Sequence, residues 1–204
     1  MITRFKVAQF FGALLAVTVS ASAATPSPNS MVAMITGGVT SQPIGHYEFC
    51  RANPGECHAI RSNMAAPRVT DAGWKIVRDV NLAVNTEITP VTDQELYGRD
   101  EVWAYPVNAG DCEDFVLAKR KILMQRGFPE SALLITVVRK PDGEGHAVLT
   151  LRTASGDFVL DNLDNDVKPW YQTPYTYLKR QATFDSGRWV SIENGSDVLV
   201  GALQ

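Results

Sequence analysis

The chain has 204 residues, of which 45% are hydrophobic and 20% are charged, and its formal net charge is −3. This composition is typical of a globular protein with one domain, and it excludes a disordered chain or a chain embedded in a membrane throughout. A mildly acidic chain also lacks the basic surface on which nucleic-acid binding depends. We therefore expect no nucleic-acid partner.

The first residues have the pattern of a secretory signal peptide. Arg4 and Lys6 precede the apolar run VAQFFGALLAVTVS, and the small residues ASAAT follow it. The run is too short to span a bilayer as a helix. We expect residues 1–23 to be removed by cleavage after Ala23, which changes the net charge from −3 to −5. The mature protein is then periplasmic or secreted.

Export determines how the three cysteines are interpreted. In an oxidising compartment Cys50 and Cys57, with six residues and a Pro-Gly turn between them, are expected to form a disulfide. His46 and His58 flank this pair, and the four side chains together are also a possible tetrahedral zinc site. Export favours the disulfide. Cys112 remains as the unpaired thiol.

The segment before Cys112 is predicted to contain loops and a helix. Residues 24–45 are rich in Pro, Ser, Thr and Gly and predict a flexible segment with one short strand at Met31–Thr36. A helix is predicted from Thr70 or Asp71 onward, because apolar and buried-type residues recur at helical spacing at Trp74, Val77, Asn81 and Val84. A loop with one short helical turn follows, up to Gly110.

Residues 112–126 form the clearest predicted helix, and Gly127 and Pro129 end it. Three strand-like runs follow at residues 132–140, 146–153 and 158–163, separated by the turn-forming sequences PDGEG and ASG. The run RWVSIE predicts a further strand. A helix followed by an antiparallel sheet is an α+β fold, in which we expect Cys112 at the N-terminus of a helix packed on the sheet.

Cys112 lies where free backbone N–H groups favour a thiolate, whereas the acidic neighbours Asp111 and Glu113 oppose it. The thiol therefore needs a basic partner. His146 opens a strand directly after a glycine-containing turn, and Asp161 on the following strand is placed to orient its imidazole.

The spacing alone leaves the third residue open. A hairpin that turns at Ser155–Gly156 places Asp161 opposite Thr150, two side-chain steps along the same face from His146. A looser turn or a bulge is needed to close that gap. Asp164 and Asn165 are alternatives for the same role.

Three stretches in this order, GDCEDFVLAKRKILMQRGFP, GHAVLTLRT and GDFVLDNLDNDVKPW, resemble the bacterial transglutaminase-like cysteine peptidases. This family includes a periplasmic protease that releases large biofilm adhesins from the cell surface. The likeness runs from about Trp74 to about Trp189. It implies a papain/transglutaminase-like fold, hydrolysis of a peptide bond by a triad of Cys112, His146 and Asp161, and no organic cofactor. The motif match, not the spacing, selects Asp161.

The resemblance also implies a calcium ion at Asp111 and Glu113, the acidic residues that flank the nucleophile. Oxygen ligands suit Ca²⁺, and a bound cation would cancel the negative charge that opposes thiolate formation. The alternative is that Asp111 caps the helix and Glu113 interacts with its dipole. The family further implies a protein substrate, with a surface adhesin as the candidate, and an inner-membrane regulatory receptor.

We expect residues 46–204 to form the peptidase domain. Two other functions remain open at this point. In a transglutaminase or another acyltransferase, the same triad catalyses acyl transfer to an amine. The same fold can also serve as a non-catalytic binding module. An intact triad argues against the module. Trp103 and Tyr105 are candidates for the wall of the cleft, and the backbone N–H of Cys112 for an oxyanion hole.

Overall fold

The computed structural model describes Met1 and residues 32–61 and 65–195. The predicted signal peptide beyond Met1, and Met31, lie outside the described residues. Within the described ranges no helix is long and apolar enough to cross a membrane.

A seven-stranded sheet with the order β1-β9-β8-β4-β5-β6-β7 forms the centre of the fold, and every neighbouring pair is antiparallel. Its strands are β1 (Thr36–Thr40), β4 (Leu133–Arg139), β5 (Gly145–Thr153), β6 (Gly156–Leu160), β7 (Lys168–Pro169), β8 (Thr176–Ala182) and β9 (Asp185–Ile192). A separate parallel pair consists of β2 (Thr89–Pro90) and β3 (Ala109–Gly110). The antiparallel sheet confirms the predicted fold class.

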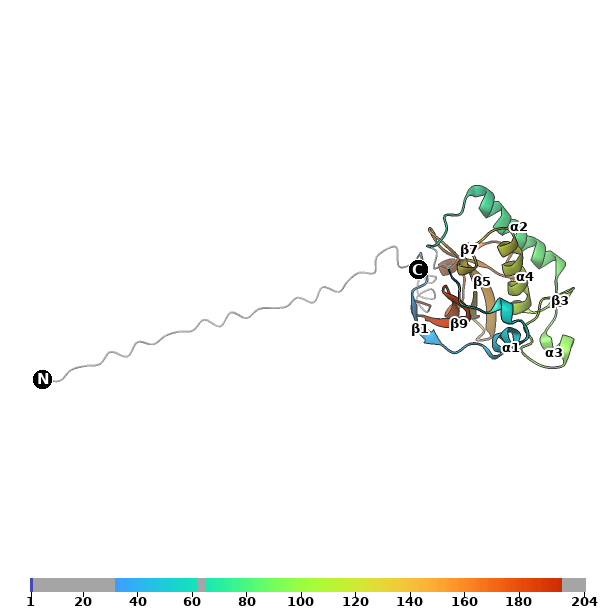
Figure 1. The fold of residues 1–204 in the computed structure, drawn as a ribbon, viewed down its shortest axis with the longest axis horizontal. Helices are drawn as coiled ribbons and strands as arrows, with labels where there is room; N and C mark the ends of the chain where they lie inside the picture. Colours follow the sequence, from blue (N-terminus) through green and yellow to red (C-terminus); the bar gives the residue numbers. More distant parts are fainter. Residues whose placement is uncertain (2–31, 62–64, 196–204) are drawn as a thin grey trace.

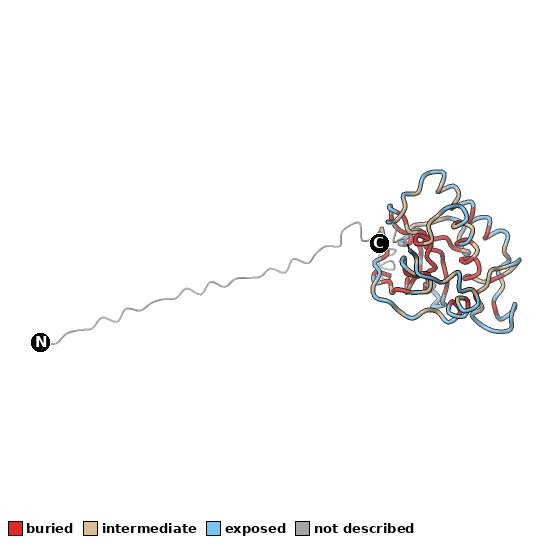
Figure 2. The backbone as a smooth tube through the Cα atoms, in the orientation of Figure 1, coloured by how far each residue is buried: buried red, intermediate tan, exposed pale blue. Residues whose placement is uncertain are grey.

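Among the described residues the sheet is accompanied by the α-helices α1 (Ile44–Ala52), α2 (Asp71–Glu87), α3 (Asp93–Tyr97) and α4 (Cys112–Gln125). Short 3-10 turns lie at Pro54–Glu56, Glu130–Ala132 and Trp170–Gln172. Helices α2 and α4 lie together on one side of the sheet (Figure 1). The buried part of the tube in Figure 2 follows α4 and the central strands, so α4 is the helix most enclosed by the rest of the fold.

The two faces of the sheet carry separate cores. One face packs on α2 and α4, and its core includes Val77, Phe115, Leu123, Leu149 and Trp189. The opposite face has its own cluster, made of Met34, Val138, Val148, Val159, Trp170, Tyr175, Tyr177 and Ile192. Because side chains alternate along a strand, neighbouring residues of β5 serve the two cores in turn.

The predicted helices begin and end close to the expected residues. Thr70 caps α2 by accepting a hydrogen bond from the backbone N–H of Gly73, and the stripe that includes Val77 and Val84 is buried. Helix α4 ends at Gln125, one residue before the predicted end, and is followed by Gly127 with φ +88°. The short helical turn predicted in the loop is α3, which starts with a capping box between Thr92 and Glu95.

The predicted pairing register of the hairpin between the second and third of these strands was wrong by two residues. Thr153 pairs with Gly156, so the loop is Ala154–Ser155 and Thr150 lies opposite Val159. The hydroxyl of Thr153 fixes this tight turn by accepting from the N–H of Ser155 and donating to the carbonyl of Gly156, which has φ +116°. This register moves Asp161 two residues nearer to His146 along β5. Asp161 is also not in the strand, which ends at Leu160.

Three further features differ from the expectation. The strand predicted at Met31–Thr36 lies instead at Thr36–Thr40, where it pairs with β9. Helix α1 was not predicted, because its N-cap Pro43 makes no capping hydrogen bond and no clear apolar stripe marks it. Strand β8 was missed because its sequence TYLKRQA contains a buried arginine, Arg180, which pairs with Asp157 at 3.0 Å.

Candidate active site

Cys112 is the first residue of α4, and Asp111 before it makes no side-chain capping bond. The sulfur lies against β5, where the backbone N–H of Ala147 acts to lower the pKa of the thiol. Its own S–H donates to Glu113 Oε2 at 3.0 Å. Burial and the negative charge of Glu113 raise the pKa of the Cys112 thiol well above its usual range, so the resting thiol is protonated.

His146 and Asp161 form a buried pair. His146 Nε2 lies 2.9 Å from Asp161 Oδ1, and the two side chains are 4% and 5% exposed. The other carboxylate oxygen accepts from Tyr175 Oη at 2.5 Å, and the backbone N–H of Leu163 donates to Oδ1 at 3.0 Å. Burial acts to raise the pKa of Asp161, but the bonds from His146, Tyr175 and Leu163 outweigh it and hold the pKa below its ordinary value.

An ionised Asp161 has consequences for the imidazole. A carboxylate only accepts hydrogen bonds, so Nε2 of His146 carries the proton of this pair. Nδ1 is then the nitrogen that can receive a proton from a thiol. The structure thus joins His146 to Asp161 directly, and it places Cys112 beside the neighbouring residue of the strand, Ala147, with its S–H directed to Glu113.

The two alternatives to Asp161 have other partners. Asp164 forms an ion pair with Lys168, and the side-chain carbonyl of Asn165 accepts from Asn85 Nδ2 at 3.0 Å. Asn85 also donates to the backbone carbonyl of Asp161 at 2.8 Å, which ties the residues after β6 to α2. The contact with His146 therefore belongs to Asp161.

A cluster of buried carboxylates lies next to the nucleophile. Asp93, at the start of α3, joins Asp111 and Glu113, and one oxygen of each lies within 4.8 Å of the others. Asp114, fully buried, accepts from the backbone N–H of Ala104 at 2.8 Å. One oxygen each of Asp93, Asp111 and Asp114 is buried without a hydrogen-bond partner in the part of the chain that the structure describes.

The pKa of every carboxyl group in this acidic cluster is raised. Burial and the neighbouring Glu113 raise the pKa of Asp111 to about 8. Burial raises the pKa of Asp114 to about 7, although the N–H of Ala104 opposes the shift, and it also raises the pKa values of Asp93 and Glu113. Unpaired buried carboxylate oxygens in one small volume are a donor set for a hard cation such as Ca²⁺. The residues predicted from the sequence, Asp111 and Glu113, are two members of this larger set.

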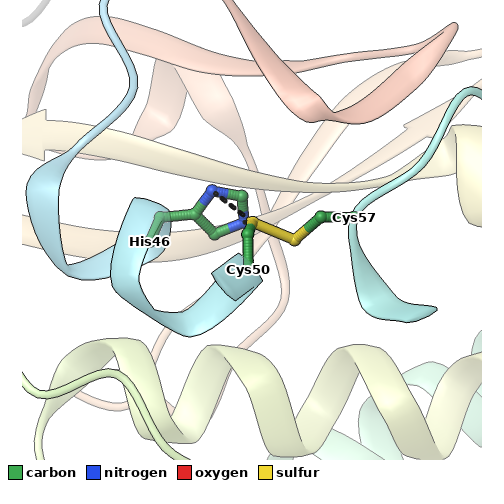
Figure 3. A group of neighbouring side chains, drawn as sticks. All are labelled: His46, Cys50 and Cys57. Carbon is green, nitrogen blue, oxygen red and sulfur yellow. Dashed lines mark hydrogen bonds between the residues drawn. A yellow bond between two sulfur atoms is a disulfide. The ribbon is translucent and has the colours of Figure 1, made fainter. Parts of the chain in front are cut away.

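The disulfide between Cys50 and Cys57 is present, with a Cα–Cα distance of 5.5 Å, and Cys112 is the free cysteine. Figure 3 shows the imidazole of His46 beside this bond, with Nδ1 3.6 Å from the sulfur of Cys50. Because the two sulfurs are bonded to each other, they offer no thiolate to a metal. His58 points elsewhere, to Glu130 at 3.4 Å. The geometry therefore supports the disulfide and not the zinc site.

His46 is instead a buried residue of the core. It is 1% exposed, and Trp189 Nε1 donates to its Nδ1 at 3.1 Å. Burial, with a contribution from Arg120, lowers the pKa of His46 to about 3, so the ring is neutral. Trp103 packs edge-on against His46 and is buried, so it belongs to the core and not to a cleft wall. Tyr105 is partly buried and lies under Lys121.

Sequence reasoning missed four groups around this site, namely Tyr175, Asn85, Asp93 and Asp114. Asp114 is adjacent to a quoted motif residue and could have been suspected from the density of acids in GDCED. The other three approach from distant elements, and no local pattern marks them. Asp93 in particular looks like an ordinary first-turn acid of a capped helix.

A cysteine at the start of a helix, beside a strand whose histidine pairs with an aspartate, is the arrangement of a papain/transglutaminase-like cysteine hydrolase. The model of one family, bacterial transglutaminase-like cysteine proteinase, matches residues 36–197. The chain belongs to this family, and it is a cysteine peptidase by class.

Solved structures with a similar fold include LapG of Legionella pneumophila in several forms. The calcium-bound form has a TM-score of 0.50 and 22% identity, covering 64% of this chain and 80% of LapG. The EGTA-treated form has a TM-score of 0.50 and 23% identity, covering 64% and 79%. A third form has a TM-score of 0.49 and 25% identity, covering 64% and 76%. No curated protein matches the chain.

Proposed function

We propose that the mature protein is an exported, calcium-dependent cysteine peptidase that cleaves a protein substrate with Cys112, His146 and Asp161. The observation that carries this proposal is the buried His146–Asp161 pair at 2.9 Å, in which His146 lies on β5, the strand against which the Cys112 sulfur lies. Family membership supports the reaction class. The periplasmic or secreted location stays a prediction from the N-terminal sequence.

The proposed mechanism uses each group in turn. His146 Nδ1 takes the proton of Cys112, and the sulfur attacks the carbonyl carbon of the scissile bond. The free N–H at the start of α4 stabilises the oxyanion that develops. His146 then protonates the leaving amine, and water, with its proton taken by His146, releases the second product from the acyl-enzyme. Asp161 keeps Nε2 protonated and the ring oriented throughout.

The acidic cluster supports the proposal that a cation takes part in this mechanism. Because the S–H of Cys112 donates to Glu113, Cys112 is held as a neutral thiol. Its proton is then directed to Glu113 and not to His146. Asp93, Asp111 and Glu113 would hold Ca²⁺, which would supply the positive charge that favours ionised carboxylates and a thiolate nearby. Glu113, once it serves as a ligand, no longer competes for the proton of Cys112. LapG has been solved in a calcium-bound form, which supports this assignment.

A surface adhesin is the proposed substrate, and an inner-membrane receptor the proposed regulator, by the family resemblance of the GDCED, GHAVL and VLDNL motifs. Transglutaminase activity is the main alternative, because an amine in place of water would resolve the same acyl-enzyme. A binding module without catalysis does not account for the buried His146–Asp161 pair, whose orientation a binding function would not need.

The test is a comparison of protein N-termini in the surface and secreted fractions of the source bacterium. Cells that produce the unaltered protein should generate new N-termini that are absent from cells producing Cys112→Ala or His146→Ala. Amine-modified or cross-linked proteins without new N-termini would identify an acyltransferase. The same N-termini in all three strains would refute the peptidase.

A further inference from the structure

Helix α2 carries two asparagines, Asn81 and Asn85, that have no part in the catalytic mechanism. They lie four residues apart and therefore on the same face of the helix. Asn81 is fully buried, in a stripe that it shares with the apolar side chains of Val77 and Val84. A buried amide costs stability unless its N–H groups are bonded, so an asparagine in this stripe requires a partner.

The amide nitrogens of both asparagines donate to the segment that follows β6. Asn81 Nδ2 donates to the backbone carbonyls of Asp164 and Asn165, at 3.1 Å and 3.0 Å. Asn85 Nδ2 donates to the backbone carbonyl of Asp161 at 2.8 Å and to the side-chain oxygen of Asn165 at 3.0 Å. The side-chain oxygens of both asparagines are buried and have no partner among the described residues. The two side chains therefore hold this segment through their N–H groups.

This segment lies outside the sheet. Strand β6 ends at Leu160 and β7 begins at Lys168, so residues 161–167 connect the two strands without being part of either. Backbone carbonyls that leave a sheet in a buried place need donors from elsewhere in the fold. Asp161, the first residue after β6, is 4% exposed, and the donor for its carbonyl comes from α2.

Helix α2 also supports the helix that presents the nucleophile. Val77 of α2 belongs to the same core cluster as Phe115 of α4, and the two helices lie together on one side of the sheet (Figure 1). Cys112 is the first residue of α4. One helix therefore contacts both the helix that carries the thiol and the segment that carries Asp161.

We infer that Asn85 is a positioning residue, whose amide holds the main chain of Asp161 so that the carboxylate meets His146 Nε2. This inference rests on the proposed triad. The bonds from His146 and Tyr175 reach only the carboxylate of Asp161, whereas the bond from Asn85 reaches its main chain. With the main chain held, only the side-chain torsions of Asp161 remain free. Asn85 acts on the reaction through Asp161 alone.

The test replaces Asn85 by Leu, which has the same branched shape but no N–H donor. Asn85→Ala, which places no apolar group against the carbonyl of Asp161, repeats the test independently. Asn81→Leu removes the neighbouring amide, whose bonds go to later residues of the segment. Asn53→Leu is the control, because the Asn53 amide also donates to a backbone carbonyl, that of Phe49 in α1 at 3.1 Å.

Three measurements are made on each protein. The first is the rate at which iodoacetamide alkylates Cys112 in the presence of Ca²⁺, followed from about pH 5 to about pH 10. The second is the proton NMR signal of His146 Nε2–H. The third is the midpoint of thermal unfolding, which reports stability separately from the alignment of the catalytic pair.

Asn85→Leu and Asn85→Ala should slow the alkylation at neutral pH by about threefold to tenfold, the effect of one hydrogen bond. A poorly aligned Asp161 stabilises the imidazolium of His146 less, so the thiolate forms at higher pH. The midpoint of the rate profile should therefore rise by about 0.5–1 pH unit, and the rates should converge above it. The His146 Nε2–H signal should move upfield, because its bond to Asp161 weakens.

The other two variants should separate positioning from stability. Asn81→Leu should lower the unfolding midpoint at least as much as Asn85→Leu, because the Asn81 amide is the more buried of the two. It should change the alkylation rate by less than about twofold, since its bonds do not go to Asp161. Asn53→Leu should match the unaltered protein in its rate profile and in its His146 signal.

An alkylation profile and an NMR signal that are unchanged in both Asn85 variants would overturn the inference. So would equal losses of rate in Asn81→Leu and Asn85→Leu, or losses that follow the unfolding midpoint in every variant, because Asn85 would then be structural. If Cys112 of the unaltered protein proves unreactive, the proposed function fails, and the His146 signal still decides the role of Asn85.

Discussion

Replacing Tyr175 by Phe isolates one bond that supports the catalytic pair. The hydroxyl of Tyr175 donates to Asp161 Oδ2 at 2.5 Å, and the two residues are 7% and 4% exposed, so solvent does not replace the bond freely. A buried hydrogen bond to an ionised group contributes about 1.5–3 kcal/mol to stability. We expect the free energy of unfolding to fall by that amount at neutral pH, and the unfolding midpoint by about 3–12 °C.

The loss should depend on pH in a defined direction. The pKa of Asp161 is held below its ordinary value in the folded protein, so its bonds add stability above the unfolded pKa of about 4. That contribution disappears as the pH falls through the lower, folded pKa. In Tyr175→Phe the folded pKa moves up, so the difference in stability between the two proteins should be largest at neutral pH and should shrink below about pH 4.

Urea unfolding of both proteins at neutral and at acid pH measures the effect. Tyr171→Phe is the control, because Tyr171 is 39% exposed and its ring contacts Trp170 without any bond to Asp161. A stability loss in Tyr175→Phe that is the same at both pH values, or no larger than that of the control, would refute an ionised Asp161 held by Tyr175.

Further changes test the orienting residue, the acidic cluster and the disulfide. Asp161→Asn should slow turnover by about three to four orders of magnitude and leave the fold intact, as loss of the orienting carboxylate does in serine triads, and a kcat measurement with protein substrate checks this. Because burial raises the carboxylate pKa values, with Asp111 at about 8, the calcium-free protein should lose stability as the pH rises from about 4 to about 8. Added Ca²⁺ should restore that stability, and calorimetry should find weaker calcium binding in Asp93→Asn. Thiol counting on the denatured, unreduced protein should find one free cysteine, and reduction of Cys50–Cys57 should cost about 2–3 kcal/mol; three free thiols would refute the pairing.

The elements with strong local signals were predictable from the sequence. Helix α4 has an apolar face, a cysteine at its start and a glycine after its end, and these signals depend only on residues close together in the chain. Cys112 and His146 were found in the same way. Strand β8 and helix α1 were missed because their stability comes from distant partners, such as Asp157 for Arg180.

The contacts that hold Asp161 and Asp93 in the site could not be predicted for the same reason. The position of Asp161 depends on a two-residue turn that the hydroxyl of Thr153 fixes, and on a bond from Tyr175 that arrives from a separate part of the chain. Asp93 reaches the acidic cluster from α3. Spacing along the chain carries no information about such contacts, whereas the family motif identified Asp161 despite a wrong pairing register.

The most direct test of the central claim is intact-mass spectrometry of the mature protein during inactivation by iodoacetamide at neutral pH, with Ca²⁺ or with a chelator. If Cys112 is the nucleophile, one label per molecule should appear on Cys112, faster with Ca²⁺, and the fraction of activity lost should equal the fraction labelled. A fully labelled protein that still cleaves its substrate would contradict the account.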